Sequence, residues 1–180
     1  GFGRRDLPTL QDRLVEALDR LPADRRDRAH LLFSAHSIPS TMAANCDYVA
    51  QLHEVARLVA QRVDPAGRHN RELVWQSRSG PPQTSWLEPD VGDRIDALAA
   101  AGVDAVVVSP IGFPVENFEI VWDLEVEAAG RAERAGVAFQ RAAAIDDDQR
   151  FVDMVVDLFL GHDPASARTC RADCCPPLPH

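Results

Sequence analysis

Four short apolar runs alternate with longer amphipathic segments along the chain. The runs are continuous and end at polar or Gly- and Pro-containing stretches, which is typical of strands buried on both faces of a parallel sheet. Strands are expected at 31–35, 72–77, the start of 104–113, and 137–145. A helical pattern follows each run, and this alternation predicts βαβ units. The fold class is therefore α/β, with a parallel sheet of about four strands flanked by helices.

The helices are predicted from apolar residues three and four positions apart. The first such pattern is Leu10, Leu14, Leu18 and Leu21 within 7–21, and a polar connection is expected over 22–30. Further helices are predicted at 42–63, 90–101, 116–135 and 147–160. Glycine follows the last three of these helices, as expected at a helix end. The chain then becomes polar and rich in Cys and Pro, which divides it into a domain at 1–162 and a tail at 163–180.

Length and charge narrow the functional classes. With 180 residues, 46% hydrophobic and 26% charged, the chain has the balance of one soluble globular domain. Its net charge of −9 and lack of a basic stripe argue against nucleic acid as a partner and give no support for membrane contact. The start of the chain does not resemble a secretory signal, so a cytoplasmic protein with reduced thiols is expected.

A histidine follows the first predicted strand. In open α/β sheets, ligands bind beyond the carboxyl ends of the strands, and His36 in FSAHSIP takes such a position. Imidazole titrates near neutral pH and is a common metal ligand. A polar residue that caps the strand end is an equally good interpretation of His36 on position alone.

Four acidic residues line the segment after the third strand. Glu116, Glu119, Asp123 and Glu127 are spaced by three, four and four residues, which places them on one face of a helix. A solvated acidic face is the simplest interpretation, and the helix dipole favours carboxylates in the first turn. Asp123 and Glu127 lie beyond that turn, so a file of carboxylates that conducts protons or hydrated cations is the alternative.

Two further segments have unusual composition. WQSRSGPPQTSWLEP, at 75–89, could line an aromatic-walled pocket with Arg78 free to pair with a carboxylate, or could be a rigid connection with Trp86 in the core. The tail carries Cys170, Cys174 and Cys175 within six residues. Three thiols so close together indicate soft-metal ligation by iron–sulfur or zinc, although a tail with incidental thiols is the alternative.

Together these segments resemble ferrochelatase, the enzyme family that inserts ferrous iron into a porphyrin. The matching motifs are FSAHSIP at 33–39, WQSRSGPPQTSWLEP at 75–89 and PIGFPVENFEIVWDLEVE at 110–127, and the resemblance extends over 7–162. It implies a chelatase-like fold of two similar α/β domains around a porphyrin cleft. This chain resembles only the C-terminal domain, so the N-terminal domain would be its missing partner.

The resemblance also assigns roles to residues. The family's metal-binding histidine falls on His36 and its catalytic glutamate on Glu119, and the acidic helix that is thought to conduct protons or metal falls on Asp123 and Glu127. Many members have an Asp-His pair where this chain has Glu116-Asn117, so a relay there would depend on Glu116.

The tail has a counterpart in the family as well. Some members carry a [2Fe–2S] cluster on C-terminal cysteines, which Cys170, Cys174 and Cys175 resemble; the remaining ligand would lie in the absent half, and Cys46 does not match its position. The implied substrates are Fe²⁺ and a porphyrin, coproporphyrin III rather than protoporphyrin IX. The alternative is a non-catalytic porphyrin- or metal-binding module on the same fold.

Overall fold

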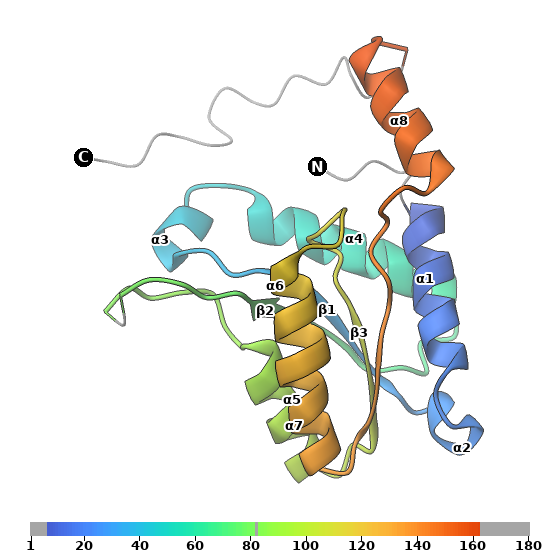
Figure 1. Ribbon diagram of the computed structural model, residues 1–180, viewed down its shortest axis with the longest axis vertical. Helices are drawn as coiled ribbons and strands as arrows, with labels where there is room; N and C mark the ends of the chain where they lie inside the picture. The colour runs from blue at the N-terminus through green and yellow to red at the C-terminus, as the bar shows by residue number, and fades with distance from the viewer. Residues whose placement is uncertain (1–6, 82, 163–180) are drawn as a thin grey trace.

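The computed structural model describes residues 7–81 and 83–162 (Figure 1). Its centre is a sheet of four parallel strands in the order β2-β1-β3-β4. The strands are β1 (His30–His36), β2 (Arg71–Gln76), β3 (Ala105–Ser109) and β4 (Ala138–Arg141). The predicted α/β class and four-stranded parallel sheet are thus confirmed. In the described part of the chain, none of the helices combines the length and the apolar character that crossing a bilayer requires.

Helices cover both faces of this sheet. They are α1 (Leu7–Asp19), α2 (Ala23–Arg26), α3 (Ser40–Ala43), α4 (Tyr48–Val63), α5 (Val91–Ala100), α6 (Phe118–Ile120), the π-helix η1 (Val121–Ala128), α7 (Ala129–Arg134) and α8 (Gln149–Phe159). Successive strand residues point to opposite faces. Leu31 and Phe33 of β1 therefore join the core beneath α1 and α4, whereas Leu32 joins the core beneath α5, η1 and α7.

The order of the strands creates a switch point beside β1. The chain passes from β1 to β2 on one side, then crosses back over β1 to form β3 on the other side. The connections that leave the carboxyl ends of β1 and β3 therefore diverge, which is where open α/β sheets bind ligands. His36 ends β1, and the segment after β3 leads into α6.

Three helical regions differ from the sequence-based prediction. A short helix, α2, lies within the polar connection expected at 22–30. The helix expected at 42–63 is instead divided into α3 and α4, and in the break the Asn45 side chain donates to the Thr41 carbonyl over 2.7 Å. Such side-chain bonds compete with helical backbone bonding. The helix expected at 116–135 begins only at Phe118, because Asn117 caps it by accepting from the Ile120 N–H, and its centre is the π-helix.

Gly112 brings the β3–α6 connection against β1. A Cβ atom at this position would lie 2.4 Å from the Ala35 Cβ and 2.7 Å from the Ala35 Cα. The Gly112 N–H donates to the Ser34 carbonyl over 3.1 Å. Only glycine allows this approach, which holds the segment leading to α6 against the residue that precedes His36.

A buried histidine makes the stability of the fold depend on pH. His30 is 7% exposed, and burial lowers the pKa of its imidazole below the ordinary value, although Glu72 at 2.7 Å opposes the shift. The unfolded chain therefore binds a proton more readily than the native protein, so the free energy of unfolding should fall as the pH drops below about 6.5. One such group contributes a slope of at most ~1.4 kcal/mol per pH unit.

This dependence is measurable by denaturant unfolding between pH 7 and pH 5. His30→Gln should flatten the slope, whereas His53→Gln, which replaces an exposed imidazole on α4, should leave it unchanged. An equal slope in the His30→Gln protein would contradict the assignment.

Candidate active site

His36 lies at the end of β1 with its ring oriented by its own backbone. Its Nδ1 is 2.5 Å from the Ser37 carbonyl oxygen. Since a carbonyl can only accept, Nδ1 carries the hydrogen, and the lone pair of a neutral ring is on Nε2. The Tyr48 hydroxyl donates to the His36 carbonyl over 2.9 Å, and burial raises the pKa of this hydroxyl, so it remains a donor at neutral pH. The strand end and the imidazole are therefore held together.

Glu119 faces this histidine from the other side of the switch point. It lies in the first turn of α6, and its Oε2 is 3.7 Å from the His36 Nε2. This distance exceeds a hydrogen bond, so the Nε2 lone pair and the carboxylate both remain available to a third group. The two side chains are 34% and 53% exposed, which leaves the pair open to solvent in this chain.

Asp123 lies farther along the same helix and is bound to the end of β2. The Ser77 hydroxyl donates to Asp123 Oδ2 over 2.5 Å, and the buried Gln76 amide approaches the same oxygen at 3.4 Å. Ser77 has a φ of 60°, a left-handed conformation that is unfavourable for a residue with a side chain. The strained turn after β2 therefore directs a hydroxyl onto this carboxylate.

Glu127 is the next carboxylate along the helix after Asp123, and it lines a pocket of about 560 Å³. Its Oε1 accepts from the Trp122 Nε1 over 3.2 Å, and Trp122 stacks on Phe118 with ring centroids 6.1 Å apart. Phe118 is 77% exposed although it is fully apolar. The pocket is lined by Ser37, Trp75, Ser77, Arg78, Leu87, Glu88, Pro89, Asp90, Val91, Gly92, Asp93, Asp123, Glu127, Ala128 and Arg131. The helical segment α6–η1 thus carries the exposed aromatic rings and contributes two carboxylates, those of Asp123 and Glu127, to the lining of the pocket.

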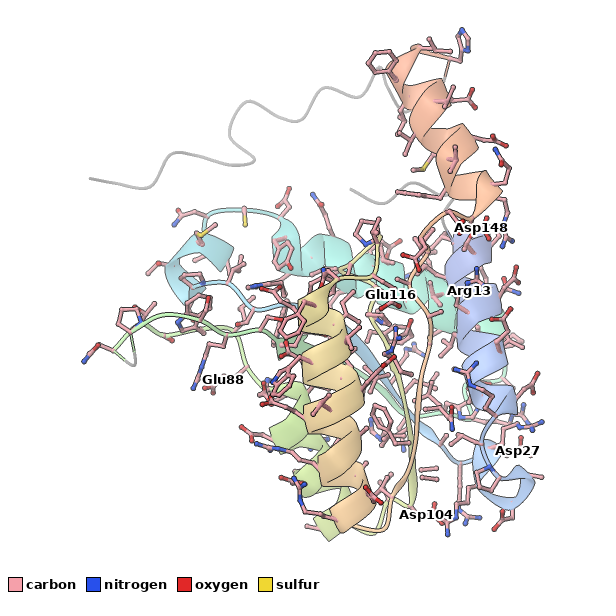
Figure 2. All side chains as sticks on the ribbon, in the orientation of Figure 1. Arg13, Asp27, Glu88, Asp104, Glu116 and Asp148 are labelled. Carbon is pink, nitrogen blue, oxygen red and sulfur yellow. The ribbon has the colours of Figure 1, made fainter. Side chains whose placement is uncertain are left out.

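Glu116 does not lie on the same face as Glu119, Asp123 and Glu127. Its Oε1 accepts from Arg141 over 2.5 Å and from the Ala144 N–H over 3.1 Å, which directs it toward the segment after β4 (Figure 2). The physical reason is that helix α6 begins after Asn117, so Glu116 precedes the helix and does not share its face. The structure gives Glu116 a role in anchoring the β3–α6 connection, and a relay that includes it has no geometric support.

The loop at 75–89 is bound to the loop after β1. The Ser37 hydroxyl donates to the Leu87 carbonyl over 3.0 Å, and the Leu87 N–H donates to the Ile38 carbonyl over 3.1 Å. Trp86 is half-buried, whereas Arg78 is 61% exposed and lies 3.8 Å from Glu88. Among its described residues, Ser77, Arg78, Leu87, Glu88 and Pro89 line one wall of the pocket, whereas Trp86 belongs to neither the pocket lining nor the buried core.

The cysteines fall in two places. Cys46 lies half-buried between α3 and α4 as a free thiol. Cys170, Cys174 and Cys175 lie outside the described residues. Within 7–81 and 83–162, no three His, Cys, Asp or Glu side chains are grouped closely enough to form a ready metal site.

Several supporting residues were not assigned a role from the sequence. The sequence did contain a reason to examine Gln76 and Ser77, since they stand at the carboxyl end of the strand predicted at 72–77, at the edge of the sheet where ligands bind. Nothing in the sequence indicated that Tyr48 would bond the His36 carbonyl, because the two residues lie on separate elements, β1 and α4, joined by a segment that contains α3.

Comparison with known proteins gives a consistent result. The family model described as Ferrochelatase matches residues 7–162. A coproporphyrin III ferrochelatase of Nocardia farcinica is 43% identical over 95% of this chain and 54% of its own length. Proteins of the same name from Mycolicibacterium smegmatis and Mycobacterium leprae are 49% and 44% identical, over 82% and 90% of this chain and 43% and 49% of their own lengths. The chain therefore spans about half the length of the curated relatives it matches.

Proposed function

Because the chain belongs to the ferrochelatase family, we propose that it is the C-terminal half of an enzyme that inserts Fe²⁺ into a porphyrin for heme synthesis. The observation that carries the proposal is the pair formed by His36 and Glu119, whose Nε2 and Oε2 face each other over 3.7 Å at the switch point of the sheet. Both side chains are accessible, and neither is occupied by the other.

The chemistry of this pair suits the reaction. Metallation strips water from Fe²⁺ and removes the pyrrole N–H protons of the macrocycle. Imidazole and carboxylate are ligands that suit Fe²⁺ as it arrives. A neutral imidazole whose Nε2 is unprotonated also accepts a proton near physiological pH. The fixed Nδ1–H of His36 therefore matters, because it presents Nε2 to the substrates.

Asp123 and Glu127 are proposed to move protons or hydrated cations toward or away from Glu119. The support is their position: both follow Glu119 along one helix, and both line the pocket of about 560 Å³. Asp123 accepts hydrogen bonds from Gln76 and Ser77, which keeps its carboxylate oriented.

The exposed rings of Phe118 and Trp122 are proposed to contact the porphyrin, since a flat apolar macrocycle is held by aromatic surfaces. Coproporphyrin III is the favoured substrate because the similar actinobacterial proteins carry that name. Coproporphyrin also has more propionates than protoporphyrin, and Arg78 is an exposed cation beside the pocket. Competition between the two porphyrins for metallation tests this preference.

A second, amino-terminal half of the same polypeptide is proposed to close the site. The relatives are about twice as long, and His36 and Glu119 are open to solvent here. The 180-residue chain alone should therefore bind porphyrin but metallate it weakly or not at all. The same sequence joined behind the amino-terminal half of the Nocardia farcinica relative, called the joined polypeptide below, should metallate it.

Absorbance distinguishes these outcomes. Metallation converts the free-base porphyrin spectrum into a metalloporphyrin spectrum when Fe²⁺ is added, whereas binding only shifts the bands. Robust turnover by the 180-residue chain alone would refute the two-half arrangement. A joined polypeptide that only shifts the bands would identify the alternative, a non-catalytic porphyrin-binding module.

The tail is proposed to hold a [2Fe–2S] cluster, in a protein that works in the cytoplasm. The donor set fits three of the four thiolates such a cluster requires, from Cys170, Cys174 and Cys175. Cys46 is a single half-buried thiol between two helices and is not assigned as the fourth. Such a cluster would supply a redox-sensitive element.

Replacing Cys174 with serine should remove the brown colour and the visible charge-transfer bands of the anaerobically purified joined polypeptide. Cys46→Ser is the matched control and should leave both unchanged. A colourless parent protein, with zinc or no metal by elemental analysis, would contradict the cluster.

A further inference from the structure

The only tyrosine of the chain, Tyr48, joins the first turn of α4 to the carboxyl end of β1. Its hydroxyl donates to the His36 carbonyl over 2.9 Å. Its ring lies against the buried ring of Trp75 on β2, with ring centroids 5.9 Å apart. Asp47, the residue before α4, makes no side-chain capping bond. The Tyr48 side chain therefore connects the start of α4 to both strands at the edge of the sheet where the site lies.

The carbonyl that accepts this bond belongs to the peptide unit between His36 and Ser37. The N–H of the same unit, on Ser37, donates to the Gln76 carbonyl over 2.8 Å. A trans peptide unit is planar, and its C=O and N–H point in opposite directions. Tyr48 therefore holds the plane from one side and β2 holds it from the other. Rotation of the plane would break one of the two bonds.

The orientation of this plane determines where the imidazole points. The Nδ1 of His36 is 2.5 Å from the carbonyl oxygen of Ser37, the next residue along the chain. Rotation of the plane would displace Ser37 with its carbonyl, so Nδ1 would lose its acceptor. The ring could then turn, or move its hydrogen to Nε2. In either case the Nε2 lone pair would no longer face the Glu119 Oε2 over 3.7 Å.

The Tyr48 hydroxyl suits this task at neutral pH. Burial, with a smaller effect of the neighbouring Cys46 thiol, raises the pKa of the hydroxyl above its ordinary value, so the group keeps its hydrogen and donates. One hydrogen bond contributes only a small part of the stability of a domain. Its loss should therefore change the orientation of the His36 peptide unit and leave the chain folded.

We propose that Tyr48 is a positioning residue for metallation: its bond to the His36 carbonyl keeps the imidazole in the tautomer and orientation that present Nε2 toward Glu119. Tyr48 acts from α4, outside the residues that line the pocket of about 560 Å³. The effect on the rate rests on the proposed function, whereas the effect on the imidazole is a property of the 180-residue chain itself.

Tyr48→Phe in the joined polypeptide tests the effect on the rate. The variant keeps the ring against Trp75 and removes only the hydroxyl, so kcat for metallation should fall roughly tenfold through misplacement of the imidazole. The loss should be smaller than that of His36→Ala because the ring is still present, and KM for the porphyrin should be unchanged. Ser40→Ala is the matched control. It removes a hydroxyl that bonds to Ser85 over 3.0 Å, four residues after His36, and should leave kcat unchanged.

The tautomer of His36 is a second readout, which a general loss of stability would not change. It is measured from the ¹⁵N chemical shifts of the ring in the labelled 180-residue chain, with signals assigned through His36→Ala. At about pH 9, well above the ordinary pKa of histidine, the unmutated chain and Ser40→Ala should show the hydrogen on Nδ1. Tyr48→Phe should show a mixture of the two tautomers.

An unchanged His36 tautomer in Tyr48→Phe would overturn the proposal, as would an equal loss of kcat in Ser40→Ala. A raised KM with unchanged kcat would instead make Tyr48 a substrate contact and reject the positioning role. If Tyr48→Phe does not fold, the unmutated chain still decides: the hydroxyl proton of its single tyrosine should exchange slowly with water, and a fast-exchanging proton would reject the bond. A joined polypeptide that does not metallate rejects the proposed function, whereas the tautomer measurement scores the positioning alone.

Discussion

Replacing His36 with alanine in the joined polypeptide should lower the rate of porphyrin metallation by roughly 10²–10⁴-fold, the range for loss of a positioned acid–base group. The change removes both the Nε2 lone pair and the ligand that faces Glu119 over 3.7 Å. Porphyrin affinity, measured by fluorescence quenching, should change little, since the apolar contacts remain. A loss below about tenfold would remove the assigned role from His36.

Variants of Glu119 and Asp123 should lower the metallation rate to different extents, which can be compared with the effect of His36→Ala. Glu119→Gln keeps the shape of the side chain and loses its charge, so insertion should also slow severely. Asp123→Asn should have a milder effect, because water can bypass one step of a relay, and the Ser77 hydroxyl can still bond to the amide oxygen. A loss at Asp123 as large as that at His36 would place Asp123 at the reacting centre instead.

Gly112→Ala should have the largest effect on folding. The added Cβ would lie 2.4 Å from the Ala35 Cβ and 2.7 Å from a backbone atom, so the β3–α6 connection and β1 would have to separate. Overpacking of a close contact typically costs ~1–3 kcal/mol and occasionally more, and the backbone position of Ala35 places this site at the upper end. Denaturant unfolding of the 180-residue chain measures the loss.

A glycine in open space provides the control. Gly67 has no atom within 4 Å of a built Cβ, although its φ of 66° makes alanine mildly strained there. Gly67→Ala should therefore cost clearly less than Gly112→Ala. Equal losses would show that the close approach at Ala35 relaxes without cost.

The amino-acid pattern was sufficient to predict the sheet and the edge at which the site lies. Short continuous apolar runs such as LLFSA and AVVV, each bounded by polar residues, are typical of strands buried on both sides. His36 follows directly after such a run, and this position alone assigns it to the ligand-binding edge of the sheet.

Contacts between separate elements could not be predicted in this way. Whether Glu116 faced the site depended on where α6 begins, and that was decided by Asn117 accepting from the Ile120 N–H. The partner that draws Glu116 away, Arg141, is 25 residues distant in sequence. The strained turn at Ser77 likewise depends on the packing of a loop and has no local signature.

The π-helix changes the direction in which its side chains run. An α-helix turns by about 100° per residue, so residues spaced four apart drift by about 40° at each step and spiral away from one face. A wider turn counters that drift. Ile120, Leu124, Ala128 and Ala132 are spaced four apart, yet all four remain buried against the sheet. The carboxylates of Glu119, Asp123 and Glu127 share this spacing and therefore run nearly parallel to the helix axis. These three carboxylates recur every four residues, which is longer than the 3.6-residue repeat of an α-helix. The wider turn of the π-helix therefore keeps their charges in a nearly straight row.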